Sequence, residues 1–490
     1  MSPFIIILTI IAYLLVVFCV AYRSGQRSDN AAFFTGNRST SWYMATLAMI
    51  GAAMSGVTFI SVPGSVAADS MTYMQMVAGF TVGQLVVAFL LIPLFYRLGI
   101  VSLYEYLDRR FGITTHRAGA GCFLAAKIIS ASLKIYVVCV VMQLLVFDAL
   151  GIPFWTTALL TMFFVWLYTR RGGVKVLIPT DAIQSVCLVG SVVVCVVSLA
   201  RSMNLDSVGE LYDAVATSPY SQMWLFDNAA SPRYFWKMFF GGVLCLVAMT
   251  GLDQDMMQRN MSCRTVRDSQ INIVLTALCQ IGVILLLLVL GVLLYRYVEF
   301  AGLRMPMRGD DIFPYVAVQG GLPKVVGVMF VLGLISSTYS AAGSALTSLT
   351  TSFTIDILGS SRNDESAVSR RRQRVHAAMA VVVAALVVVL NYLCNDSVIN
   401  VVFKVAGYTY GPILGLFVFG MITKRKVREC FVPFVVILSP LLGGLLQRLM
   451  AMHYNYHIGF ELLGYNALLT IIGLWIISRR DATATNPEIE

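Results

Sequence analysis

"VMFVLGLISSTYSAAGSALTSLTTSFTID", residues 328–356, begins like a membrane-spanning helix and continues with a hydroxyl group at many of its positions. The lipid interior offers these hydroxyl groups no hydrogen-bond partner, so the chain itself or a bound ion has to supply one. The small and hydroxylated residues recur at spacings of three and four, which places them on one helix face: Gly333, Ser336, Ser337, Ser340 and Ser344. Such a face favours either close helix packing or the presentation of oxygen ligands to a small cation.

The composition of the whole chain is that of an integral membrane protein. Of its 490 residues, 58% are hydrophobic and only 12% are charged, and the mean hydropathy is +0.80. Soluble domains are about half apolar and about a quarter charged. The ten cysteines lie almost entirely in apolar runs or basic loops, which indicates small core residues and not a disulfide framework. The net charge of +10 lies in short loops, so we expect the lipid bilayer and no nucleic acid as a partner.

Apolar runs of about 20 residues recur along the entire length, and each is long enough to cross the hydrocarbon core. We therefore predict an all-α polytopic membrane protein with about 13 transmembrane helices. The predicted spans lie near 3–22, 41–67, 72–97, 118–147, 153–169, 176–200, 234–255, 270–295, 322–356, 375–394, 398–423, 429–450 and 459–478.

Basic residues concentrate in alternate connections between these spans. These connections are "YRSGQRSDNAAFFTGNR", "YEYLDRRFGITTHR", "TRRGGVK", "QRNMSCRTVRD", "SRRRQR", "TKRKVR" and the pair Arg479–Arg480. The positive-inside rule makes them cytoplasmic, which predicts an outside N-terminus and a cytoplasmic C-terminus in a plasma (inner) membrane. The charges of the first span follow its apolar run, which favours a membrane helix over a signal peptide.

Two of the predicted spans are interrupted by glycine. The stretch 47–64, "LAMIGAAMSGVTFISVPG", carries Gly51 and Gly56, and the stretch 239–255, "FFGGVLCLVAMTGLDQD", carries Gly251. Glycine permits close helix packing, but it also lets backbone carbonyls turn outward beside a cavity or an ion. The two interrupted spans lie five spans apart and run in opposite directions, which is the layout of an inverted-repeat secondary transporter.

This layout divides the chain into six units. They are a first peripheral helix with its cytoplasmic loop (1–40), a first inverted repeat (41–200), an extracytoplasmic loop (201–233), a second inverted repeat (234–424), C-terminal peripheral helices (425–480) and a cytoplasmic tail (481–490).

Five motifs, in their order along the chain, resemble the sodium:solute symporter family, which includes sodium-coupled sugar, proline and sialic acid transporters. The motifs are "AAFFTGNRSTSWYMATLAMIGAAMSG", "LIPTDAIQ", "GLDQDMMQRNMS", "SALTSLTTSFTID" and "AGYTYGPILGLF". The resemblance covers essentially the whole chain and implies a LeuT-type fold with a five-plus-five inverted repeat. It also implies Na⁺ as the coupling ion and the only metal, with no other cofactor, and we expect the monomer to be functional.

The resemblance further implies a main sodium site between the second and ninth spans. Two backbone carbonyls of the broken second span would face a carbonyl and two hydroxyls of the ninth. The matching positions here are Gly51, Met54, Ser337, Ser340 and Ala341. Alanine has no hydroxyl group at the last position, so the site would bind sodium more weakly, recruit Ser336 or Ser344, or use water.

A second sodium site occurs in some members on an acidic residue of the sixth span. That position matches Asp181, and Ser340 and Ser344 could complete the site. A carboxylate in an apolar run is costly and should have a cation partner. The alternative is an interfacial aspartate that caps a helix after "GGVK".

The solute pocket should lie at the membrane midplane between the two interrupted helices. Each candidate lining residue has packing as its alternative role. The candidates are Ser55, Thr58 and Phe59 of the second span, Gln75 of the third, Thr250 at the break of the seventh, and Tyr408 and Tyr410 as aromatic gates.

Lys134 lies deep in "FLAAKIISASLKIYVVCVV", where a lysine cannot easily reach either membrane face. Its ammonium group needs an anion, either a carboxylate of the solute or of the protein, or else helix carbonyls. The resemblance is relevant because sialic acid transporters place a basic residue on this helix. Lys127 is expected to reach the cytoplasmic surface, and Lys404 to lie near the outer interface.

These observations predict a sodium-coupled secondary active symporter that imports a small polar solute by alternating access. Carboxylated solutes (a sugar acid, sialic acid, an organic acid or an amino acid) are candidates because of Lys134. The alternatives are a channel or facilitator, or a proton-coupled or sodium-independent carrier of the same fold. An enzyme is disfavoured because all four histidines fall in predicted connections: His116, His376, His453 and His457.

Overall fold

The computed structural model describes residues 3–26, 28–359, 365–393, 398–454, 456 and 458–479, and the predicted tail 481–490 lies outside them. Within this part of the chain, nine helices are long and apolar enough to cross a membrane, and two bent helix pairs raise the count to eleven. Two shorter apolar helices, α10 (Phe154–Thr169) and α21 (Leu462–Ile477), accompany them. The prediction of a helical multi-pass membrane protein is confirmed.

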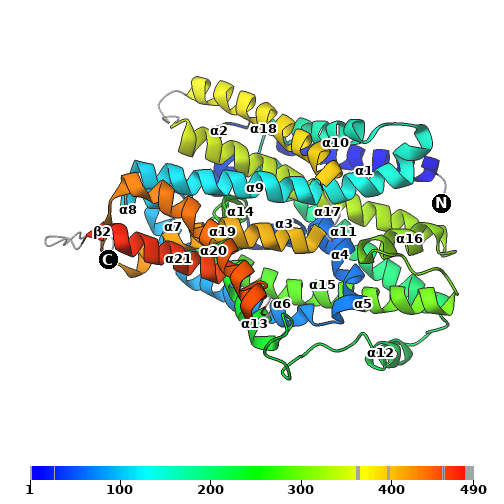
Figure 1. Cartoon of the computed structure of the whole chain (residues 1–490). Coiled ribbons are helices and arrows are strands. Elements are labelled where there is room, and N and C mark those ends of the chain that lie inside the picture. Colours follow the sequence, from blue (N-terminus) through cyan, green and yellow to red (C-terminus); the bar gives the residue numbers. More distant parts are fainter. Residues whose placement is uncertain are drawn as a thin grey trace.

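The long helices lie side by side in one bundle, and α1 begins at the end opposite to β2 (Figure 1). They are α1 (Pro3–Ser24), α6 (Tyr73–Val86) continued by α7 (Ile92–Leu98), α9 (Ile113–Met142), α11 (Val174–Ser202), α15 (Val266–Phe300), α17 (Lys324–Ser352), α18 (Glu365–Leu393), α19 (Val398–Ile422) and α20 (Val432–Tyr454). Short helices in the connections are α2 (Asn30–Thr35), α5 (Val66–Asp69), α8 (Glu105–Arg110), α12 (Val208–Ala216) and α16 (Ile312–Gln319). The strands β1 (Lys426–Val427) and β2 (Ser478–Arg479) pair antiparallel.

Both glycine-interrupted spans are bent at a break. The first is α3 (Trp42–Ala53) with α4 (Gly56–Gly64), which meet at 58°. The second is α13 (Phe235–Leu246), extended by a π-helical turn to Gly251, with α14 (Gln254–Asn260), which meet at 69°. Met54 (φ −96°, ψ 84°) and Asp253 (φ −98°, ψ 121°) lie outside helical geometry, so the backbone is unwound at each break.

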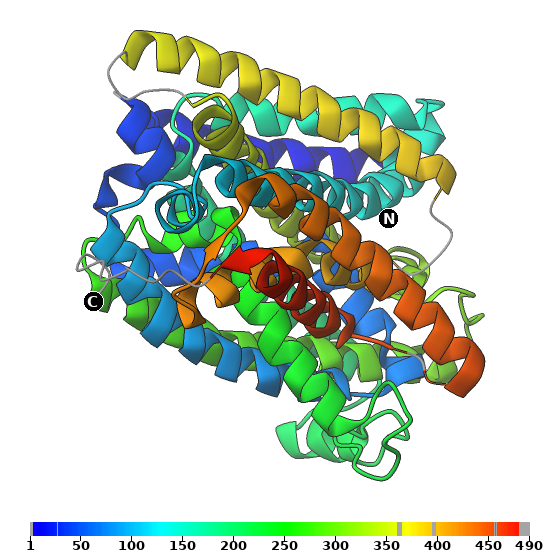
Figure 2. The same ribbon diagram turned by 60° about the vertical axis from the view of Figure 1, so that its left-hand side comes forward.

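The hydroxyl-rich helix α17 forms the centre of the bundle. Its membrane-crossing window is 78% buried, against 22% for the window that contains α20. Figure 2 accordingly shows α18 (yellow) and α20 (orange to red) along the outer edges of the molecule. Most hydroxyl groups of α17 donate to the carbonyl of the preceding turn, as Thr347 does to Gly343 O at 2.9 Å. Packing and local hydrogen bonds therefore account for most of this polar face.

Glycines also bring α6 and α13 into direct backbone contact. A Cβ atom added at Gly79 would collide with the carbonyl oxygen of Phe239, and one added at Gly242 would collide with that of Met76. The contact is therefore reciprocal, and no larger side chain fits on either side of it. This is the small-residue packing that membrane helices use to approach closely.

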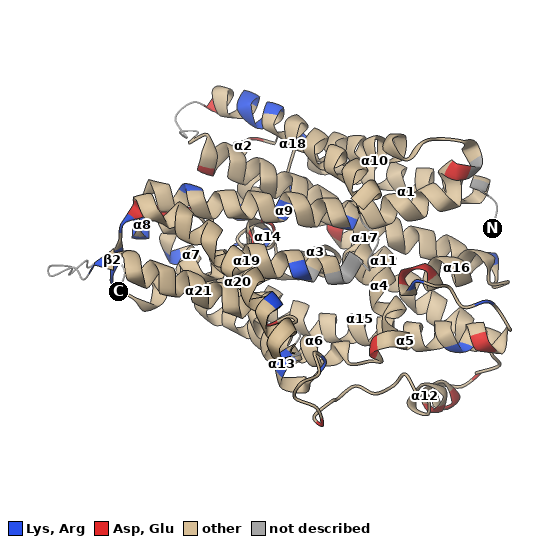
Figure 3. Cartoon of the chain, in the orientation of Figure 1, with Lys and Arg blue, Asp and Glu red and all other residues tan. Residues whose placement is uncertain are grey.

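Many Lys and Arg residues lie at the end of the bundle that contains α8, β2 and the first turns of α18 (Figure 3). Two histidines of this region correct the sequence prediction, because His116 lies in α9 and His376 in α18. His116 contacts Asp356 at 3.0 Å, and His376 lies between Thr169 and Thr350 at 2.9 and 2.8 Å. Both helices begin earlier than predicted, so His116 lies in the first turn of α9 and His376 lies about three turns into α18. His457 lies outside the described residues.

Candidate functional site

A cavity lies beside the two helix breaks. Its volume is about 120 Å³, which is room for roughly eight to twelve water-sized groups. The sequence-predicted residues that line it are Ser55, Thr58, Lys134, Thr250 and Tyr410. Residues that the sequence interpretation did not single out for the site complete it, among them Gln84, Lys127, Asp253 and Gln280.

Three predicted solute residues do not line this cavity. Phe59 is fully buried and packs against Phe313 and Phe330, with ring centroids 5.1 and 5.9 Å away. Gln75 holds the 201–233 connection, since its amide donates to Arg233 O and accepts from Leu225 N. Tyr408 lies on the other side of α19 and donates to Gln447 of α20. Contacts within the protein account for the positions of these three side chains.

Lys134 lines the cavity without a protein partner. It is half-buried on α9, and it makes no hydrogen bond or ion pair with any residue that the structure describes. An ammonium group in a mostly apolar cavity needs compensation by an anion. No described residue thus supplies the anion that the sequence analysis predicted for the Lys134 ammonium group.

Lys127, one to two turns away on the same helix, corrects the prediction that it reaches the cytoplasmic surface. It is only 5% exposed, and its Nζ contacts Asp255 Oδ2 at 2.6 Å and Asp253 Oδ2 at 3.0 Å. The Tyr410 hydroxyl donates to the same oxygen of Asp253. Asp253 lines the cavity at the break, and its side chain also caps α14 by accepting from Asp255 N.

Arg259 continues this chain of charges on the side away from the cavity. Its Nη1 donates to Asp255 Oδ1 at 2.6 Å, and its Nε and Nη2 donate to Asp181 Oδ2 at 3.1 and 2.8 Å. Asp181 lies in the interior of α11 and is fully buried, so it does not cap that helix. We call Asp181, Arg259, Asp255, Lys127 and Asp253 the charge ladder; it joins α9, α11 and the break before α14.

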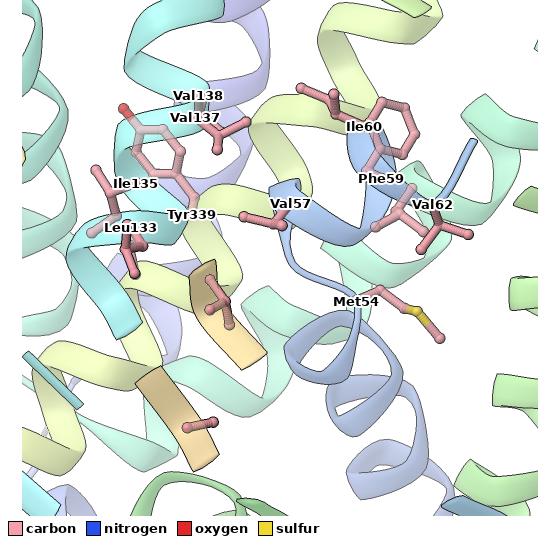
Figure 4. Packing of buried hydrophobic residues seen from close by; sticks show 14 of the residues in the cluster. Met54, Val57, Phe59, Ile60, Val62, Leu133, Ile135, Val137, Val138 and Tyr339 are labelled. Carbon is pink, nitrogen blue, oxygen red and sulfur yellow. The ribbon is translucent and has the colours of Figure 1, made fainter. Parts of the chain in front are cut away.

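The break of the first bent span lies directly against α11 and α17. A Cβ atom at Gly51 would lie 2.5 Å from Ser185 Oγ, 3.1 Å from Asp181 O and 3.4 Å from Ser340 Oγ. A Cβ atom at Gly56 would lie 2.8 Å from Thr338 Oγ1. Figure 4 shows Met54 in the unwound link, with Val57 directed from α4 toward Tyr339 of α17. The structure therefore brings together the two stretches on which the sodium prediction depends.

Two polar atoms at this junction are buried without a hydrogen-bond partner, namely Ser340 Oγ and Asp181 Oδ1. An unsatisfied buried acceptor costs about 1–3 kcal/mol, and more when it is charged. Ser340 is among the side chains nearest to the Asp181 carboxylate. An ion with a radius smaller than that of water, bound between these oxygens, would satisfy both.

The remaining predicted ligands have partners of their own. Ser337 Oγ donates to Leu334 O at 2.9 Å, and Ala341 is buried with no side-chain oxygen. Ser344 Oγ donates to Asp255 Oδ2 at 3.2 Å and to Ala341 O at 3.1 Å. Ser344 thus contacts the charge ladder through Asp255 and not through Asp181.

The functional candidates that sequence reasoning missed had a detectable signal. Asp253 and Asp255 stand beside Gly251 at a predicted helix break, and Arg259 follows Asp255 by four residues. Acidic and basic groups at that spacing lie on one helix face, and within a membrane they face other charges. Gln84 and Gln280, which share a hydrogen bond of 2.7 Å in the cavity wall, gave no comparable signal because each is a single amide in an apolar helix.

Two transporters resemble this chain in sequence. The human sodium/iodide cotransporter is 27% identical over 422 residues, which are 81% of this chain and 62% of that protein. Sodium-coupled monocarboxylate transporter 2 of Danio rerio is 25% identical over 411 residues, 82% of this chain and 64% of that protein. The chain thus spans less than two thirds of the length of these relatives.

Two solved structures share the fold. A Na⁺-coupled sialic acid symporter in a substrate-bound outward-open state superposes with a TM-score of 0.80 at 18% identity, covering 96% of this chain and 97% of that one. MHP1, a nucleobase-cation-symport-1 family transporter, gives a TM-score of 0.55 at 12% identity over 92% and 95%. The model of the sodium:solute symporter family matches residues 33–429. Because this match covers well over half of the chain, the protein belongs to the sodium:solute symporter family.

Proposed function

We propose that the protein is a sodium-coupled symporter that imports a small carboxylated solute by alternating access. The observation that carries this proposal is Lys134, a cation in the cavity wall without an anionic partner among the described residues. Family membership supports the sodium coupling. Sodium-coupled monocarboxylate transporters among the relatives support a carboxylate.

The cavity also offers neutral polar groups to the solute. Ser55, Thr58, Thr250 and Tyr410 supply hydroxyl groups to the same cavity.

We further propose 13 spans with five-plus-five inverted repeats at 41–200 and 234–424. The two bent spans, one near the start of each proposed repeat, support this arrangement. The basic residues near α8 and β2 in Figure 3 support a cytoplasmic C-terminal end and an outside N-terminus.

The proposed cation site uses the backbone near Gly51 and Met54 together with Ser340 and the unpartnered oxygen of Asp181. Support comes from the contact of Gly51 with Ser340 and from the two unsatisfied oxygens. Ala341 contributes only its carbonyl, so this set has one hydroxyl fewer than the family pattern implies. Ser337 would contribute after a rotation away from Leu334 O.

Uptake into proteoliposomes with an inward sodium gradient tests the proposal. We expect sodium-dependent accumulation of short carboxylates and not of neutral sugars of similar size. Lys134→Met should abolish carboxylate uptake, whereas Lys404→Met, which removes an exposed lysine of α19, should not. Carriers show exchange acceleration in counterflow with labelled solute, so its absence would favour a channel. Equal uptake without sodium would contradict the coupling.

A further inference from the structure

The charge ladder is not balanced. Its three carboxylates, Asp181, Asp253 and Asp255, face two cations, Lys127 and Arg259, and all five residues are at most 5% exposed. If each group carries its ordinary charge, the ladder has a net charge of −1. Within the ladder, Asp181 Oδ1 is the carboxylate oxygen that has no hydrogen-bond partner among the described residues.

Lys134 carries the opposite surplus. It lines the same cavity as Lys127 and Asp253, within electrostatic range of Asp253 and Asp255, but contacts neither. The charges of the five ladder residues and Lys134 therefore sum to zero, although the positive and the negative surplus lie at different places. In a medium of low dielectric constant such separated charges act on one another over several ångströms.

We propose that Lys134 couples the binding of the two ligands. The solute anion compensates the positive charge of Lys134, and the cation compensates the negative charge of the ladder. The inference rests on the proposed function and deepens it. A cation bound alone at Asp181 leaves Lys134 uncompensated, and an anion bound alone at Lys134 leaves the ladder uncompensated. Only the doubly occupied state, like the empty one, is neutral, and it has each charge next to its partner.

Two consequences follow from this charge arrangement. Each ligand raises the affinity for the other by the same factor, which for typical couplings is roughly 5- to 150-fold. One univalent anion also balances one Na⁺ within this region. A role for Lys134 that is limited to holding the solute gives neither consequence, because it leaves sodium binding in the absence of solute unchanged.

The decisive measurement is sodium binding to the purified full-length protein without solute. Removing the positive surplus by Lys134→Met should raise the sodium affinity by roughly tenfold, although the residue belongs to the solute cavity. Adding propionate should tighten sodium binding to the wild type and have no effect on this variant. Lys134→Arg should behave as the wild type, and Lys404→Met is the matched control for loss of a distant positive charge. An unchanged or weaker sodium affinity in Lys134→Met overturns the proposal.

A second variant, which removes a negative charge instead of a positive one, keeps the proposal testable if Lys134→Met folds poorly. Asp253→Asn makes the ladder neutral, so sodium affinity should fall, and propionate should bind without sodium because Lys134 keeps its surplus. The double variant Lys134→Met/Asp253→Asn should return sodium affinity toward the wild-type value. A double variant that binds sodium no better than Asp253→Asn alone would contradict the proposal.

Failure of the proposed function gives a different result. If sodium affinity responds to Lys134 as described but no carboxylate is transported, the solute assignment is wrong and the electrostatic coupling stands. If carboxylate uptake is sodium-dependent but sodium affinity ignores Lys134, the coupling is wrong and the proposed function stands. Absence of measurable sodium binding in every form overturns both.

Discussion

The two helix breaks use the same unwound backbone in opposite chemical settings. The break between α3 and α4 lies against neutral hydroxyl groups of α17, and its own residues are small or apolar. The break before α14 carries Asp253 and Asp255. Their ion pairs connect this break to α9 and, through Arg259, to α11. Neutral oxygens hold an ion weakly enough for release, whereas buried ion pairs hold helices together. The two breaks therefore differ in their surroundings, with neutral oxygens at the first and ion-paired charges at the second.

Removing Arg259 should have the largest effect, because the charged break depends on it. Arg259→Met leaves Asp181 buried without a cation and Asp255 with Lys127 alone, which costs about 3–5 kcal/mol of folding stability. Thermal unfolding of the purified protein in detergent measures this loss. Arg259→Lys should recover only part of it, since lysine cannot donate to both carboxylates in the same fork geometry. A fully stable Arg259→Met protein would contradict a structural role for this break.

At the neutral break, Ser340→Ala should change binding without changing stability. The Ser340 hydroxyl makes no hydrogen bond in the structure, so its removal leaves the fold intact. Its loss as an ion ligand corresponds to about 1.5–3 kcal/mol, or roughly a 10- to 100-fold rise in the sodium concentration for half-maximal uptake. Ser348→Ala is the matched control, because that buried serine of α17 donates to its own helix. Equal sodium dependence in the two variants would remove Ser340 from the site.

Gly51→Ala tests the close approach at the same break. The added methyl group would lie 2.5 Å from Ser185 Oγ, and such overpacking costs about 1–3 kcal/mol. Both unfolding temperature and sodium affinity should fall. The double variant Gly51→Ala/Ser185→Ala should recover stability because it removes the clashing oxygen; no recovery would mean that the contact does not limit packing there.

The smallest effect is expected from Ala341→Ser, which adds the hydroxyl group that the family pattern implies. One additional neutral ligand is worth about 0.5–1.5 kcal/mol, so sodium affinity should rise roughly 2- to 10-fold. Sodium titration of uptake at fixed solute measures the change. A fall in affinity would show that the Ala341 side chain does not face the ion.

The sequence predicts the fold more reliably than the site, for a physical reason. Long apolar runs, glycine interruptions and basic loops are local signals, and they identified the bent spans and the stretch around Ser340. Lys127 and Lys134 lie on one apolar helix and look alike in sequence, yet one is paired and the other is not. The difference is set by Asp253 and Asp255, more than a hundred positions away, and local patterns do not carry such contacts. The same holds for Gln75, whose amide contacts a connection that the pattern left undescribed.

The reciprocal glycine contact between α6 and α13 has a consequence for how the transporter moves. Backbone touches backbone at Gly79 and Gly242, so neither helix can slide or tilt past the other without collision. Because α6 lies in the first proposed repeat and α13 in the second, a hinge between the two repeats would have to break this contact. We therefore expect that opening and closing of the cavity moves α6 and α13 together as one rigid body.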